Sequence, residues 1–66
     1  MAQLPTEKAQ RVAVLWRQSR KDAGKTQEYM AEALGVSKKT IQNWEKGTTF
    51  PDLFQSIEWF SVIKRN

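Results

Sequence analysis

The chain has 66 residues, a formal net charge of +4 at pH 7 and a pI near 9.8, with neither cysteine nor histidine. Its length predicts a single domain over residues 1–66, which buries only about 60% of the surface that the unfolded chain exposes. Without a thiol or an imidazole, and with seven acidic side chains that show no catalytic pairing, we expect no enzyme. The basic charge favours a polyanionic partner such as nucleic acid.

Features that direct a chain to a membrane are missing from the sequence. Residues 1–10 are polar and hold no apolar signal core, and no apolar run approaches the roughly 20 residues of a membrane span. The absence of cysteine agrees with a reducing compartment. We therefore expect a cytoplasmic protein with no membrane partner, no metal and no small-molecule cofactor.

The first periodic segment predicts an amphipathic helix that starts near Pro5, with Thr6 as its N-cap, and stops at Gly24. Residues at spacings of three and four form its apolar stripe: Ala9, Val12, Ala13, Trp16, Arg20 and Ala23, widened by Val14 and Leu15. We expect this stripe to face the core.

Two shorter helices follow, separated by a sharp turn. Thr26 is suited to cap a helix whose apolar face is Met30, Ala31 and Leu34, and Ser37 to cap a helix over residues 38–46. Gly35 can take a positive φ between them without steric cost, and Gly47 can end the second.

The last segment begins with a capping box formed by Asp52 and Gln55. It is rich in large apolar residues, which we expect to close the core: Leu53, Phe54, Ile57, Trp59, Phe60 and Ile63. No alternation typical of strands occurs, so the predicted class is an all-α bundle of four helices, with a possible fifth at the tail. The three Trp favour core packing over nucleic-acid stacking, although Trp59, if exposed beside Phe54, would be a dimer contact.

The helix predicted over 38–46 has an outer face made of hydrogen-bond donors. On an arc of roughly 140°, opposite Ile41 and Trp44, lie Lys38, Lys39, Gln42, Asn43 and Lys46. Lysine pairs on a helix are usually just solvated, so this face indicates a binding surface only in a suitable context.

That context is a family resemblance. Two helices joined by a short turn with Gly, over residues 27–46, are typical of a helix-turn-helix. The segment "TQEYMAEALGVSKKTIQNWEKG" resembles that of the Cro and lambda-repressor-like proteins, also called the XRE family. The resemblance extends from about Ala13 to about Ile63. Its matching residues are Gln27, Ala31, Gly35, the "WEKG" ending, and the apolar positions Met30, Leu34, Val36, Ile41 and Trp44.

The resemblance implies that the second of these helices enters the major groove of double-stranded DNA. Base contacts would come from Lys38, Lys39, Thr40 and Asn43, with Gln42 at the margin. Lys suits guanine and Asn suits adenine. Ser37 at the helix start, together with Gln27, Thr26, Lys46 and Thr48, would support or make backbone contacts. Thr26 as a cap only and Lys46 as an ordinary solvated charge are alternatives of equal weight.

The resemblance also implies a structural ion pair between Arg20 and Glu45. Arg20 lies on the apolar stripe of its helix, and Glu45 lies beside Ile41 and away from the donor arc. The alternative is that Glu45 is a solvated charge.

The implied function is a repressor-like transcriptional regulator that binds a two-fold operator as a homodimer, with half-sites about 10 base pairs apart. An alternative keeps the fold as a protein-interaction module, such as an antitoxin or accessory factor. A membrane-surface role for the first helix is disfavoured by Glu7 and Asp22 and by the need for its apolar stripe in the core.

Overall fold

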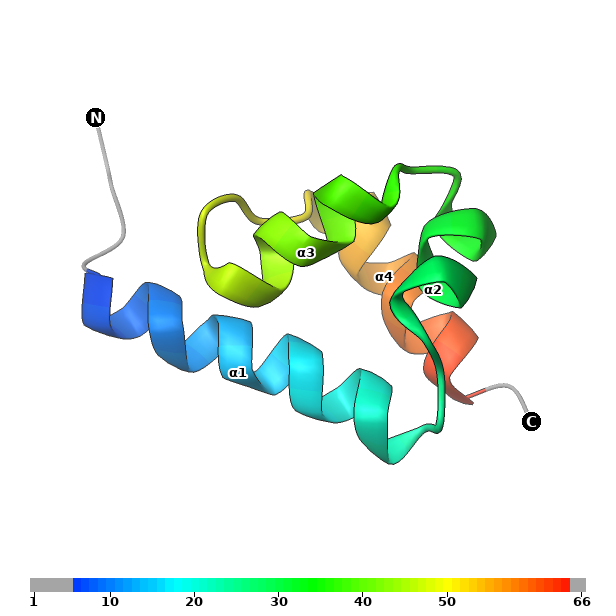
Figure 1. The fold of residues 1–66 in the computed structure, drawn as a ribbon, viewed down its shortest axis with the longest axis horizontal. Coiled ribbons are helices and arrows are strands. Elements are labelled where there is room, and N and C mark those ends of the chain that lie inside the picture. The colour runs from blue at the N-terminus through cyan, green and yellow to red at the C-terminus, as the bar shows by residue number, and fades with distance from the viewer. Residues whose placement is uncertain (1–5, 65–66) are drawn as a thin grey trace.

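The computed structural model describes residues 6–64 and divides them into four helices with no strand (Figure 1). These are α1 (Thr6–Asp22), α2 (Gln27–Leu34), α3 (Lys38–Lys46) and α4 (Leu53–Lys64). The predicted all-α class is confirmed, and the described part of the chain contains no fifth helix. Pro5 and the side chain of Thr6 lie outside the described residues, so the cap predicted there stays a prediction. No helix within residues 6–64 has the length and apolar composition needed to cross a bilayer.

Side-chain caps set the starts of the last three helices. The Thr26 hydroxyl accepts a hydrogen bond from the Tyr29 N–H at 2.9 Å, and the Ser37 hydroxyl accepts one from the Thr40 N–H at 3.1 Å. At α4, the Gln55 N–H donates to the Asp52 carboxylate at 2.8 Å, and the Asp52 N–H donates back to Gln55 Oε1 at 3.0 Å. All three caps predicted from the sequence at these helices are confirmed, because each satisfies N–H groups that a helix start leaves unpaired.

Gly35 produces the turn between α2 and α3. Its φ of 70° lies in the left-handed region, and the following Val36 N–H donates to the Ala31 carbonyl at 2.9 Å. This geometry ends α2 and directs Val36 back onto the core, where it is half-buried. The turn thus fixes how α3 leaves α2.

The core is built around three tryptophans from three helices. Trp16 meets Trp59 edge-on, with ring centroids 5.0 Å apart, and Trp44 lies 6.1 Å from Trp59. Trp59 has no exposed surface, and its indole N–H donates to the Ser19 hydroxyl at 3.0 Å. The core role of the tryptophans is confirmed, and Trp59, being buried, is not a dimer contact.

Two groups of apolar residues predicted to face the core are exposed. On α4, the inward face consists of Trp59 and Val62 with half-buried Ile63, and the opposite face carries Leu53, Phe54, Ile57 and Phe60. On α1, Val14 and Leu15 are also exposed. The prediction was wrong for five of these six, because each helix buries one face in a small bundle and other residues fill that face. It is confirmed in part for Phe60, which is 48% exposed but packs its ring against Trp16, with ring centroids 5.3 Å apart.

α1 runs along one side of the molecule, and α3 packs against both α1 and α2 (Figure 1). α4 packs against α2, on the far side of α2 and α3 in the view of Figure 1. This arrangement leaves the outward side of α3 uncovered by the other described helices.

Candidate nucleic-acid interface

α3 is held by its inner face and presents its donors outward. Ile41 has no exposed surface and Trp44 is 2% exposed. On the other side of the helix, Lys38, Lys39 and Lys46 are exposed, and Gln42 and Asn43 are half-buried. Among the hydrogen bonds within residues 6–64, none has the side chain of Lys39, Gln42, Asn43 or Lys46 as its donor. Their donors are therefore available to a ligand.

The first turn of α3 combines a cap with two neighbouring hydroxyls. The Ser37 and Thr40 side-chain oxygens lie 3.0 Å apart, in addition to the capping bond from the Thr40 N–H. No acidic residue lies in this turn. The positive end of the helix dipole is thus uncompensated by an acidic side chain in that turn and favours an anion nearby.

Lys38, unlike the other donors, has a protein partner. Its ammonium lies 3.4 Å from a carboxylate oxygen of Glu28 on α2, and both side chains are largely exposed. A backbone hydrogen bond at Glu28 itself, and then the charge of Lys38, lower the pKa of the Glu28 carboxyl below its ordinary value of 4.5. The carboxylate is therefore charged at neutral pH and competes with any anionic ligand for Lys38.

A buried ion pair ties α3 to the rest of the domain. Arg20 Nε lies 2.7 Å from one oxygen of Glu45, and Arg20 Nη2 lies 3.1 Å from the other, with the side chains 11% and 5% exposed. The third guanidinium nitrogen donates to the Lys25 carbonyl at 2.8 Å. The structure thus brings Arg20 and Glu45 together as a two-pronged pair, and Glu45 is not a solvated charge.

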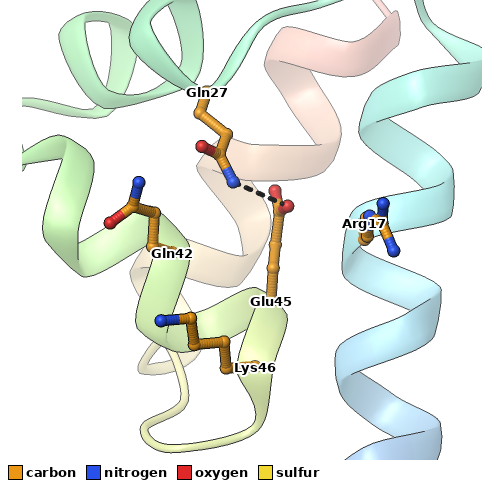
Figure 2. A pocket seen from close by; sticks show the side chains of 5 residues that line it. All are labelled: Arg17, Gln27, Gln42, Glu45 and Lys46. Atoms are coloured by element: carbon orange, nitrogen blue, oxygen red, sulfur yellow. Dashed lines mark hydrogen bonds between the residues drawn. The ribbon is translucent and has the colours of Figure 1, made fainter.

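Gln27 extends this pair to the start of α2. Its side-chain N–H donates to a Glu45 oxygen at 3.1 Å (Figure 2). One carboxylate therefore links α1, α2 and α3, and the rotamer of Gln27 is set by a bond to a buried partner. A side chain held in this way loses less conformational entropy when it binds a further group.

A shallow cavity of about 330 Å³ opens beside this network. Its lining comes from all three linked helices: Arg17, Gln27, Gln42, Glu45 and Lys46 (Figure 2). In this view Gln42 and Lys46 project from α3, Gln27 projects from the start of α2 toward Glu45, and Arg17 stands on α1 across from Glu45. Arg17 and Lys46 are exposed cations, and both amides can donate hydrogen bonds, so the rim of the cavity suits an anion.

Arg17 is the residue of this cavity that the sequence prediction missed. Its one signal in the sequence is its position three residues before Arg20, which places both on neighbouring parts of the α1 surface. That spacing does not show which helix α1 faces. Only the packing of α1 against α3 puts Arg17 beside Gln42 and Lys46.

The predicted residues at the edges of the site have mixed surroundings. Thr26 is exposed and caps α2. The Lys46 carbonyl accepts a hydrogen bond from the Gln10 side chain at 3.3 Å, while its ammonium is unpaired by any described residue. Thr48 is exposed just after α3, and its N–H donates to the Asn43 carbonyl at 3.0 Å. None of these bonds uses the Lys46 ammonium.

Comparison with known families agrees with this geometry. A family model described as "Helix-turn-helix" matches residues 17–58, from Arg17 through the middle of α4. The chain belongs to the Cro/C1-type, or XRE, helix-turn-helix family. No curated protein and no solved structure matches it significantly.

Membership gives the general function of this helix-turn-helix protein. The family binds double-stranded DNA and acts in transcription regulation, and it is not a family of enzymes. The match includes every residue of the cavity described above and the whole of α2 and α3. The donor face of α3 is thus part of the unit that defines the family.

Proposed function

We propose that this helix-turn-helix protein is a sequence-specific, repressor-like transcriptional regulator that places α3 in the major groove. The observation that carries the proposal is the outer face of α3, whose donors are exposed or half-buried while its inner face is fixed in the core. A rigid helix with projecting donors can read base edges because the donor positions are set before binding.

Base readout in this proposal comes from the first turn and a half of α3. Lys38 and Lys39 donate to guanine O6 and N7, and Asn43 pairs through its amide with adenine. The Thr40 methyl contacts thymine, and Gln42 lies at the margin of the base contacts. Ser37 serves mainly as the cap that holds this turn in place, as its bond with the Thr40 N–H supports.

Backbone contact in this proposal is centred on the cavity between α1, α2 and α3. Arg17, Gln27 and Lys46 converge there, and together they can hold one DNA phosphate by charge and hydrogen bonds. The start of α2 adds the N–H groups of its first turn, with Thr26 and Thr48 at the periphery. The protein would act in the cytoplasm on the nucleoid, as a homodimer on a two-fold operator.

The decisive experiment selects bound duplexes from a random DNA pool and then measures binding to the selected site by fluorescence anisotropy over a range of salt concentrations. Lys39→Ala and Asn43→Ala should each weaken binding to the preferred site by about 1–3 kcal/mol and relax the choice of base at one position. Selection of no common sequence by the wild type would disprove specific readout and favour the protein-interaction alternative.

The same assay separates phosphate contacts from base contacts. Arg17→Ala and Lys46→Ala should weaken binding to all duplexes alike and reduce the slope of log K against log salt by about 1 each. Lys8→Ala is the matched control, because it removes one exposed positive charge from the side of α1 opposite Arg17. A change of slope in Lys8→Ala equal to that in Arg17→Ala would show that net charge, not this cavity, is responsible.

A further inference from the structure

α4 carries large apolar side chains on two opposite faces. Trp59 and Val62 are buried in the core, whereas Leu53, Phe54, Ile57 and Phe60 are 72%, 76%, 59% and 48% exposed. At 100° per residue, these four lie on an arc of roughly 120° centred opposite the buried face. We call them the outer stripe of α4. Phe60 lies against Trp16 of α1, with ring centroids 5.3 Å apart, whereas the described residues leave most of Leu53, Phe54 and Ile57 uncovered. A helix with large apolar side chains on two faces typically buries both, so the uncovered part of the stripe indicates a partner.

We propose that the outer stripe of α4 is the surface on which a second copy of this chain docks, with the two α4 helices antiparallel and related by a two-fold axis at Ile57. This interface rests on the proposed function in one respect, namely that two copies bind a two-fold DNA site together. The surface through which the two copies contact each other is the new part.

The spacing of the stripe is self-complementary, as a two-fold interface requires. When two α4 helices run antiparallel with Ile57 facing Ile57 of the other copy, Phe54 lies opposite Phe60 and Leu53 lies opposite Ser61. Each aromatic ring then meets a ring of the other copy, twice by symmetry. Three of the four apolar residues thus meet apolar residues.

Charge at the two ends of α4 favours the same arrangement. Asp52 caps the start of the helix, and Lys64 lies in its last turn, on the same side as the stripe. Antiparallel pairing brings the basic end of each helix toward the acidic start of the other, and it also opposes the helix dipoles. A parallel pairing would instead place like charges together.

The exposed area of the outer stripe limits how strongly two copies of the chain can associate. With about 200 Å² for each fully exposed side chain of this size, the stripe offers roughly 500 Å² per copy, and thus about 1,000 Å² in a pair. That value is at the lower limit for a specific interface, which is typical of weak association. Free protein should therefore dimerise only at high concentration, while two adjacent half-sites on DNA should raise the effective concentration and complete the pairing.

The test compares the full chain with Ile57→Glu by sedimentation equilibrium, without DNA, from about 10 to about 500 μM protein. The wild-type mass should rise from 7.7 kDa toward twice that value, and Ile57→Glu should stay at 7.7 kDa because it places two carboxylates face to face at the axis. Val14→Glu is the matched control, since Val14 is 60% exposed on α1, outside the stripe. Circular dichroism checks that all three chains are folded.

A second variant tests the axis itself. The chain has no cysteine, so Ile57→Cys introduces a single thiol at the proposed axis, and oxidation should yield a covalent dimer that Val14→Cys does not form. A wild-type chain that remains monomeric throughout, self-association of Ile57→Glu equal to wild type, or equal cross-linking of the two cysteine variants would each overturn the proposal.

Binding to DNA with one half-site distinguishes the two proposals. Ile57→Glu should bind a single half-site as the wild type does but lose the gain, about ten-fold or more, that two half-sites give the wild type. If self-association follows the stripe and no duplex is bound specifically, the interface stands and the DNA-binding proposal fails. If half-site binding is specific but Ile57→Glu keeps the two-site gain, the interface proposal fails alone.

Discussion

α3 and α4 pack into the same core through neighbouring tryptophans, yet their outer faces have opposite chemistry. Trp44 and Trp59 have ring centroids 6.1 Å apart, and both are buried. Outward, α3 presents lysines and amides, whereas α4 presents Leu, Ile and Phe side chains. The inner face of a helix thus determines how the helix is held, and the outer face determines what it can bind. A polyanion suits α3, and a second protein surface suits α4.

The largest loss of stability should come from a substitution on the inner face of α4. Trp59→Ala removes a fully buried indole and should lower the free energy of unfolding by about 3–5 kcal/mol, which is close to the whole stability of a domain this small. Phe54→Ala, on the outer face, should change it by about 0.5 kcal/mol or less at low protein concentration. Thermal unfolding followed by circular dichroism measures both, and equal losses would contradict the two-faced description of α4.

The next largest loss of stability should come from breaking the ion pair between Arg20 and Glu45, which holds the inner side of α3. Glu45→Gln leaves Arg20 charged and buried without its carboxylate, which should cost about 3 kcal/mol and lower the melting temperature by roughly 10–20 °C. Glu58→Gln is the control, because Glu58 is exposed on α4. Melting of Glu45→Gln within a degree or two of the wild type would mean that the pair contributes little to stability.

A smaller effect is expected at the end of α3. Gly47 has a φ of 81°, and a Cβ there would lie 3.1 Å from the Ala9 carbonyl oxygen on α1. Gly47→Ala should therefore cost the strain of the left-handed conformation, about 1–2 kcal/mol, and about 1 kcal/mol more for displacing α1. Gly35→Ala incurs the strain alone, since nothing lies within 4 Å of its added Cβ. Urea unfolding measures the free energy of unfolding of both variants. Equal losses in the two would show that α1 shifts near Ala9 at little cost in free energy.

The smallest effect should appear on the outer face of α3. Glu28→Gln releases Lys38 from its exposed partner and should strengthen DNA binding by roughly two- to five-fold at neutral pH. Because the pKa of the Glu28 carboxyl is lowered, the wild type should show the same gain only as the pH falls below 4.5, through that lowered pKa. Glu32→Gln, also on α2 and exposed, is the control, and an equal gain there would point to net charge and away from Lys38.

The sequence was sufficient to predict the local structure of the helix-turn-helix. The sequence predicts Thr26, Ser37 and Asp52 as N-caps, because a short polar side chain just before a segment with helical apolar spacing can accept a hydrogen bond from an N–H group of the first turn. The structure confirms all three. The donor arc of α3 was also predictable, because it follows from helical periodicity alone.

Packing of the four helices sets which apolar face of α4 is buried, and it brings Arg17 to the cavity between α1, α2 and α3. Periodicity cannot choose between two apolar faces of one helix, nor can it show which residues of distant helices meet. Both depend on how the helices pack, since burial of one side and contact across helices are properties of the assembled core. Local sequence patterns are therefore enough to predict the helices, their ends and the donors of α3, whereas packing of the helices sets which of the remaining side chains stay exposed to partners.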